Sequence, residues 1–159
     1  MAESVESAVR DLRIVVGGLI AGLSLFSVIA LAMGPISKGP DPLLGRLMLA
    51  GIALAALAGA AAYFTLRLAM RRDLAARAAE LRLHPDPAAL ILARYRQFAI
   101  AGAGVIEGPG LFAAMTYLLT GNPVAMGAVV CVVILLLAHM PSVDHVRRLA
   151  ETAAMGNEV

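Results

Sequence analysis

Four long stretches of the chain contain almost no charged residue, and they constrain the fold more than any other feature. They are residues 14–33, 47–66, 98–119 and 124–140. A helix needs about 20 apolar residues to cross a bilayer, because the hydrocarbon core is about 30 Å thick. In lipid each segment must satisfy its own backbone hydrogen bonds, and no stretch alternates with a period of two, so we expect helices. The sequence predicts an all-α, polytopic membrane protein with four transmembrane helices in a single membrane domain.

The overall composition agrees with this prediction and excludes several classes of protein. Of the 159 residues, 60% are hydrophobic and 15% are charged, whereas soluble domains carry about 25% charged residues. One cysteine and three separate histidines give no disulfide framework and no metal-ligand spacing. The charges are dispersed along the chain, so we expect no nucleic-acid partner, and no cofactor or metal.

The sequence also lacks the motifs of an enzyme. It has no Ser/His/Asp constellation and no glycine-rich phosphate loop. Cys131 lies in an apolar stretch, where we expect a buried and unreactive thiol. His139 is a conceivable haem ligand at the end of the fourth helix, but no second ligand accompanies it. We therefore expect that the protein is not an enzyme.

The distribution of Lys and Arg predicts the orientation in the membrane. Of the 13 Lys and Arg residues, only Lys38 and Arg46 lie on one side of the predicted helices, and the others lie in the two termini and the middle loop. Cytoplasmic loops carry the excess of positive charge. We expect a multi-pass protein of the cell membrane (inner or plasma membrane) with cytoplasmic N- and C-termini.

The connections predict how long the helices are. Gly121 suits the left-handed position that follows a helix, and Pro123 suits the first turn of the next helix. Together they predict a tight hairpin between the third and fourth helices. Asp73 can pair with Arg77, and Asp86 with Pro87 suits a helix start. We expect the second and third helices to extend into the cytoplasm as a helical hairpin over about residues 67–97. Its arginines are candidates for contact with lipid headgroups or a partner: Arg71, Arg72, Arg77, Arg82, Arg94 and Arg96.

Small residues recur at four-residue spacing in the predicted membrane helices. Such spacing lets helix backbones approach closely, so these residues are candidates for helix packing. They are Gly18, Gly22, Gly51, Ala55, Gly59, Gly104 and Gly108.

Glu107 is the one acidic residue inside a predicted span, close to its middle. An ionised carboxylate there is costly, so we expect Glu107 to be protonated, hydrogen bonded or next to water. Pro109 cannot donate to the carbonyl of Val105, which leaves that oxygen free near the carboxylate. The two groups are a candidate proton or cation site. The alternative is a protonated Glu107 that donates to a neighbouring helix and only stabilises packing.

Residues 46–120 resemble the helical hairpin of the proteolipid c subunit of rotary ATP synthases. The resemblance rests on a small-residue helix, a polar loop with Arg and Pro-Asp-Pro, and the string Val105-Ile106-Glu107-Gly108-Pro109-Gly110-Leu111 around a mid-membrane acid. It implies that Glu107 carries a proton. The family has a dense glycine run where this chain has Gly51 and Gly59, and two further predicted helices flank the hairpin here.

These observations favour a small structural or accessory subunit of a larger membrane complex. Its partners would be membrane lipids and either other membrane subunits or further copies of the chain. The alternative is a homo-oligomeric proton or cation pathway centred on Glu107.

Overall fold

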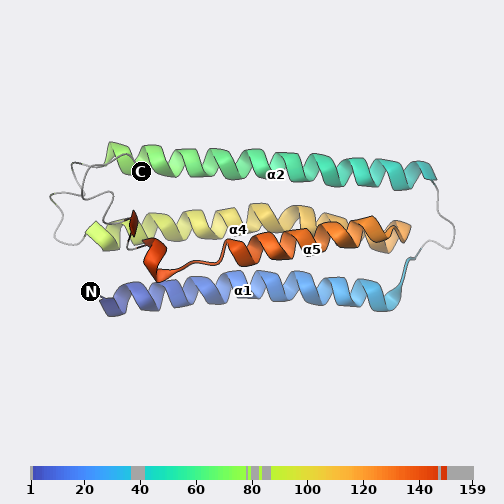
Figure 1. Cartoon of the computed structure of the whole chain (residues 1–159), viewed down its shortest axis with the longest axis horizontal. Helices are drawn as coiled ribbons and strands as arrows, with labels where there is room; N and C mark the ends of the chain where they lie inside the picture. The colour runs from blue at the N-terminus through green and yellow to red at the C-terminus, as the bar shows by residue number, and fades with distance from the viewer. Residues whose placement is uncertain are drawn as a thin grey trace.

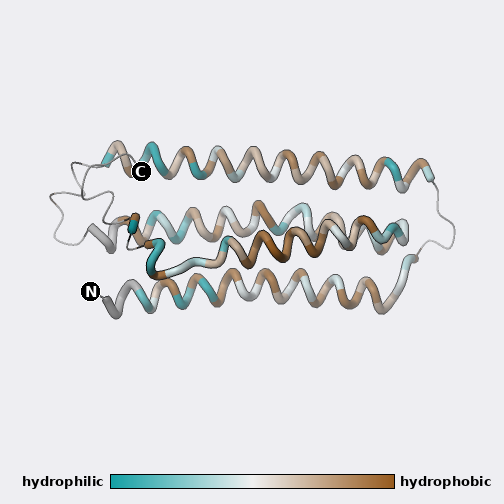
Figure 2. Tube along the Cα trace, in the orientation of Figure 1, coloured by the Kyte–Doolittle hydropathy of each residue, from teal (hydrophilic) through white to brown (hydrophobic). Residues whose placement is uncertain are grey.

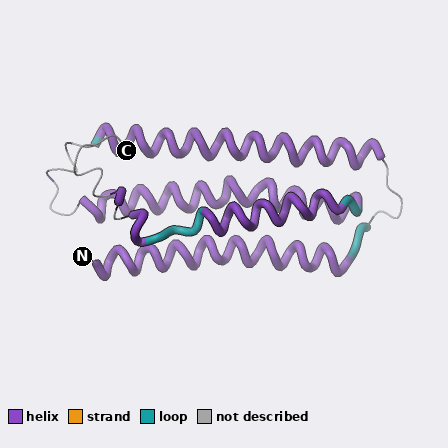
Figure 3. The backbone as a smooth tube through the Cα atoms, viewed as in Figure 1, coloured by secondary structure: helices purple, strands orange, loops and turns teal. Residues whose placement is uncertain are grey.

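The computed structural model describes residues 2–36, 42–77, 79, 83, 87–146, 148 and 149. In this part of the chain the long elements are α1 (Ala2–Met33), α2 (Pro42–Ala76), α4 (Pro87–Thr120) and α5 (Pro123–Ala138). The helices run side by side in alternating directions and form an elongated bundle (Figure 1). No strand occurs among the described residues (Figure 3). The prediction of an all-α fold is confirmed.

In the described part of the chain, three helices are long and apolar enough to cross a membrane. They lie over Glu6–Met33, Pro42–Ala76 and Ile91–Thr120. The fourth apolar stretch forms a helix of only 16 residues, fewer than the about 20 that a full span requires. The predicted helical segment 124–140 also ends early, at Ala138 with His139 as its cap. Pro141 explains this end, because it has no N–H to donate and disfavours a helical conformation at Met140.

α4 lies at the centre of the bundle and packs against α1, α2 and α5. The main buried cluster joins α1, α4 and α5 and consists of Val16, Leu23, Ala103, Ala113, Ala114, Val129, Val132 and Leu136. α2 adds almost nothing to this core, and its outer side chains Leu54 and Leu57 are 69% and 70% exposed. Thus α2 presents a long apolar face to its surroundings.

Most hydrophilic residues gather at the end of the bundle that holds the N-terminus (Figure 2). We call this the basic end, and its described arginines are Arg10, Arg13, Arg67, Arg71, Arg72, Arg77, Arg94, Arg96 and Arg148. α2 and α4 do extend beyond the predicted spans here, but they do not form an isolated two-helix hairpin. Val9 and Leu12 of α1 pack with Tyr95 of α4 and with the segment after α5. The predicted helix cap at Asp86 lies outside the described residues.

The opposite end confirms the predicted hairpin between α4 and α5. Gly121 has a φ of 68° and Pro123 is the first residue of α5. Only glycine adopts such a positive φ without strain. Asn122, which the sequence analysis did not single out, caps α5 by accepting a hydrogen bond from the Val124 amide at 3.0 Å. These contacts fix α5 antiparallel to α4.

Candidate functional site

Glu107 lies on α4 between two glycines that face open space. Gly104 and Gly108 are exposed, and a Cβ atom added at either would meet nothing within 4 Å. Residues three, four and seven apart share one face of a helix, so Gly104, Glu107, Gly108 and Leu111 form one strip, which we call the Glu107 face. Glu107 is partly exposed and Leu111 is 41% exposed.

The carboxylate of Glu107 makes no hydrogen bond or ion pair with any described residue. Intramembrane acids usually pair with another side chain or with a backbone group. Within the described part of one copy of this chain, Glu107 therefore has a carboxyl group without a partner on an open, small-residue surface.

The structure does not bring Glu107 together with the carbonyl of Val105. A Cβ built on Gly59 of α2 would lie 3.3 Å from that oxygen and 3.4 Å from the Pro109 ring. The carbonyl released by Pro109 is therefore at the α2–α4 contact. Glu107 is two residues away from both Val105 and Pro109, which places it about 200° around the helix from each. Glu107 makes no hydrogen bond to another described residue, and the two-group site stays a prediction.

The candidate packing residues divide into two groups. At Gly51 an added Cβ would lie 2.9 Å from the Phe112 ring, so Gly51 and Gly59 both lie where α2 approaches α4. Ala55, between them on α2, is half-buried. Around Gly18 and Gly22 of α1, as around Gly104 and Gly108, there is open space.

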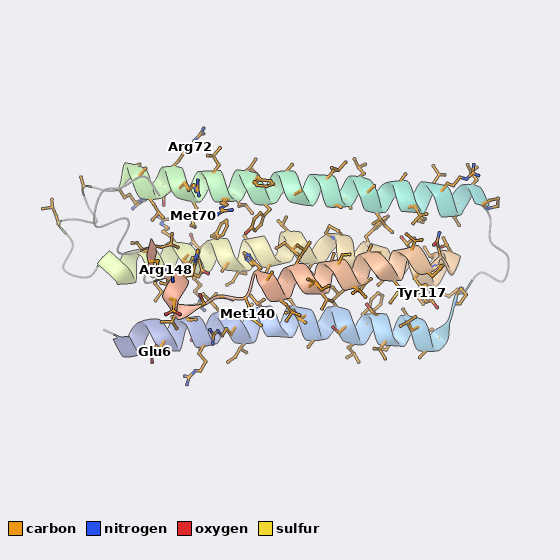
Figure 4. The ribbon with its side chains drawn as sticks, viewed as in Figure 1. Glu6, Met70, Arg72, Tyr117, Met140 and Arg148 are labelled. Carbon is orange, nitrogen blue, oxygen red and sulfur yellow. The ribbon has the colours of Figure 1, made fainter. Side chains whose placement is uncertain are left out.

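The candidate arginines have different surroundings. The Asp73 carboxylate pairs with Arg77 at 3.1 Å, as predicted, and with Arg94 at 3.4 Å, which connects α2 to α4. Arg71 lines a pocket, whereas Arg72 projects away from the other helices and Arg96 is exposed (Figure 4). Arg82 lies outside the described residues.

A cluster of aromatic residues joins three helices where α5 ends. The Tyr63 hydroxyl of α2 lies 3.4 Å from Nδ1 of His139, and Nε2 of His139 lies 3.3 Å from the Ala99 carbonyl of α4. A carbonyl only accepts, so Nε2 carries the proton and Nδ1 accepts from tyrosine. The ring centroids of Tyr63 and Phe98 are 5.9 Å apart. The neutral imidazole is thus held at both nitrogens.

Two cavities meet at this cluster. The apolar groove, of about 360 Å³, lies between α2, α4 and α5 and is lined by Ala56, Gly59, Ala60, Tyr63, Phe64, Val105, Ile106, Pro109, Val132, Leu135, Ala138 and His139. The basic pocket, of about 490 Å³, lies toward the basic end and is lined by Tyr63, Arg67, Met70, Arg71, Tyr95, Phe98, Ala138, His139, Met140, Ser142, His145 and Leu149. Tyr63, Ala138 and His139 line both. Glu107 lines neither.

Cys131 and the histidines lie in surroundings that differ from those expected from the sequence. Cys131 is exposed on the surface of α5 rather than buried, because the helix turns this side away from α4. His139 and His145, which the sequence does not place in a common ligand motif, both line the basic pocket. No group of three potential metal ligands occurs among the described residues.

The Tyr63–His139–Ala99 contacts and the two cavities were not foreseen. Tyr63 and His139 are 76 positions apart in the chain, so no local pattern connects them. One signal was available: Tyr63, Phe98 and His139 all fall near the ends of predicted spans on the same predicted side of the membrane. Antiparallel helices bring such residues to a common level.

Comparison of the chain with protein-family models, with curated proteins and with solved structures finds no significant match. The resemblance of residues 46–120 to the proteolipid c subunit therefore stays a prediction. Any function must be argued from the geometry alone.

Proposed function

We propose that the chain is a four-span protein of the inner or plasma membrane and an accessory subunit of a larger membrane complex. Its termini and basic end lie on the cytoplasmic side, in accordance with the distribution of Lys and Arg. A fourth span is supported by the position of α5 along α4 (Figure 1). α5 follows α4 from Thr120 back to Gly102, a distance of about 27 Å at 1.5 Å per residue. In this proposal the protein is not an enzyme.

The observation that carries the proposal is the unpaired carboxyl group of Glu107 on an open face. Glu107 is near the middle of the predicted span 98–119 and so, in this proposal, near the middle of the bilayer. An ionised side chain there costs at least about 2.5 kcal/mol, and a neutral carboxylic acid still lacks a hydrogen-bond acceptor in lipid. A second protein that supplies a partner to Glu107 removes this cost.

Gly104 and Gly108 make the Glu107 face suitable for a helix. Because nothing lies within 4 Å of their added Cβ atoms, another transmembrane helix can approach the backbone of α4 closely. Small residues flanking a polar residue are typical of helix contacts in membranes, where an interhelical hydrogen bond contributes about 0.6–2 kcal/mol. We infer that a helix of another membrane subunit binds here and hydrogen bonds to Glu107.

The geometry gives less support to the alternative of a homo-oligomeric proton or cation pathway. Its expected second ligand, the Val105 carbonyl, lies against Gly59 at the α2–α4 contact. A pathway would need several copies to place their Glu107 side chains around a common channel, and this remains the alternative for the same face.

The test is the composition of the complex after extraction in mild detergent from a native membrane. The proposal predicts that wild type elutes with co-purifying membrane subunits. Gly104→Leu should reduce their recovery by at least about tenfold, since bulk at a small-residue contact costs more than about 1.4 kcal/mol. Gly127→Leu is the matched control, because Gly127 of α5 is also exposed with open space around it and is not one of the candidate packing residues. Equal recovery for Gly104→Leu and wild type would refute the proposed contact.

Two substitutions at Glu107 separate the roles of its carboxyl group. Glu107→Gln keeps a hydrogen-bonding side chain and should retain the complex, whereas Glu107→Leu should weaken it. If wild type is instead a pure homo-oligomer that conducts protons or cations after reconstitution, and Glu107→Gln abolishes this flux, the alternative function is correct.

A further inference from the structure

The apolar groove and the basic pocket are adjacent, and we treat them together as one amphipathic cavity. They share Tyr63, Ala138 and His139, and they extend from these residues in opposite directions. The groove reaches toward Gly59 and Pro109 near the middle of the bundle. The pocket reaches toward the basic end. A ligand that fills both must have an apolar part and a polar part separated by a short distance.

The basic pocket has the charge expected for an anion. Among the described residues of its lining, Arg67 and Arg71 of α2 carry a fixed charge and none is acidic. The nearby Asp73 is already paired with Arg77 and Arg94. Neither Arg67 nor Arg71 forms a salt bridge to a described residue. Arginine recognises phosphate through paired N–H donors, so this surface matches a phosphate group.

The apolar groove has the shape and chemistry expected for an acyl chain. Its walls are small or apolar side chains on α2, α4 and α5. α2 and α5 touch each other little, so the groove opens sideways between them toward the surrounding lipid. Ala56 and Phe64, at the two ends of the α2 wall, are about 12 Å apart along the helix, which is long enough for a large part of one fatty-acid chain.

We propose that this cavity binds one anionic phospholipid, with its phosphate at Arg67 and Arg71 and one acyl chain in the groove between α2 and α5. The Tyr63–His139 pair lies at the level of the lipid's glycerol, where the polar and apolar parts meet. Basic pockets between transmembrane helices on the cytoplasmic side are typical sites for anionic headgroups. The proposal rests on the membrane orientation proposed above, with the basic end on the cytoplasmic side, and does not depend on a partner at Glu107.

The experiment is a titration of the purified full-length protein with phosphatidylglycerol or phosphatidylcholine, with bound lipid counted by native mass spectrometry. We expect one tightly bound phosphatidylglycerol per chain and a lower affinity for phosphatidylcholine. The double variant Arg67→Gln/Arg71→Gln should weaken phosphatidylglycerol binding by about 25-fold, or about fivefold per arginine. The control is Arg72→Gln, because Arg72 points away from the pocket (Figure 4) and should leave affinity unchanged.

A second pair of variants tests the groove independently of charge. Ala56→Phe places a ring in the groove, whereas Ala58→Phe places the same ring at an exposed position of α2 outside its lining. Only Ala56→Phe should reduce phosphatidylglycerol binding. An excess of inorganic phosphate should not displace the lipid, since it cannot occupy the groove.

Several results would overturn the proposal. Equal binding of the two lipids would show that the charge plays no part. An equal loss of phosphatidylglycerol affinity in Arg72→Gln and in the double variant would indicate binding to general surface charge. Equal effects of Ala56→Phe and Ala58→Phe on this affinity would exclude the groove as the acyl-chain site. Displacement by inorganic phosphate would indicate a site for a free anion. A dimer that covers the groove and excludes lipid would assign the cavity to a second copy of the chain.

Discussion

Replacing Gly110 with alanine should destabilise the bundle, because α1, α4 and α5 meet at this residue with no space for a methyl group. An added Cβ would lie 2.8 Å from Cγ1 of Val132 and 2.9 Å from Cδ2 of Leu23. Carbon atoms in contact prefer about 3.5–4.0 Å, so each neighbour must move by about 0.6 Å or more. Leu23 is fully buried and Val132 has a stiff β-branched side chain. Val132, whose Cβ also lies 3.2 Å from the added atom, cannot move without shifting α5, whereas the end of the Leu23 side chain must rotate within a fully buried site.

The magnitude follows from two opposing contributions. Overpacking a close-packed core costs about 1–3 kcal/mol. Exchanging glycine for alanine within a helix contributes about 0.5–1 kcal/mol in the other direction. Gly104→Ala is the matched control, because it makes the same exchange on the same helix where an added Cβ meets nothing within 4 Å. We expect Gly110→Ala to be less stable than Gly104→Ala by about 1–3 kcal/mol, which is the packing contribution alone.

The assay is unfolding of the purified protein by SDS in mixed detergent micelles, followed by near-ultraviolet circular dichroism of the tyrosines. Gly104→Ala should unfold at the same SDS fraction as wild type or at a higher one, and Gly110→Ala at a lower one. Free energies of unfolding within about 0.5 kcal/mol of each other for the two variants would refute the close contact of the three helices.

Three further predictions follow from the described contacts. Tyr63→Phe removes the hydroxyl donor to His139 and should lower the free energy of unfolding by about 0.5–1.5 kcal/mol; no change in SDS unfolding would argue against the hydrogen bond. Asn122→Ala removes the cap of α5 and should cost about 0.5–2 kcal/mol, whereas Asn122→Ser should recover most of it; equal stability of the two would contradict the cap. Single cysteines introduced at Ala76 and Gly121 of a Cys131→Ser protein should react with an impermeant maleimide from the cytoplasmic and opposite sides respectively, and labelling from the same side would refute the topology.

Much of the fold could be predicted because each cause is local. The apolar stretches account for α1, α2 and α4, and the pair Gly121 and Pro123 accounts for the α4–α5 turn. The end of α5 at Ala138 also has a local cause, Pro141. The sequence prediction placed this end at residue 140 because it followed hydropathy alone. The extension of α1 beside α4 at the basic end depends on the buried cluster that contains Leu12 and Tyr95, which no local pattern contains.

The candidate site was less predictable because it depends on how α4 is rotated. α4 packs against three helices, so apolar residues surround it and its sequence does not reveal which side stays open. Glu107 was recognisable as an unusual residue, and its two-residue spacing from Val105 already places the two on different sides of a helix, but only the contact of Gly59 with Val105 and Pro109 shows that the Val105 side faces α2. The cavity at Tyr63 and His139 likewise depends on the small contact between α2 and α5.

The measurement that tests the central claim most directly is photo-cross-linking in the native membrane. A photoreactive amino acid is placed at Leu111, on the Glu107 face, and in a separate variant at Val130, which is exposed on α5 at 57%. The account predicts a discrete protein adduct from Leu111 that is lost when Glu107 is replaced by leucine, and only lipid adducts from Val130. If Leu111 yields only lipid adducts, as Val130 does, the Glu107 face binds no partner helix and the proposed function is wrong.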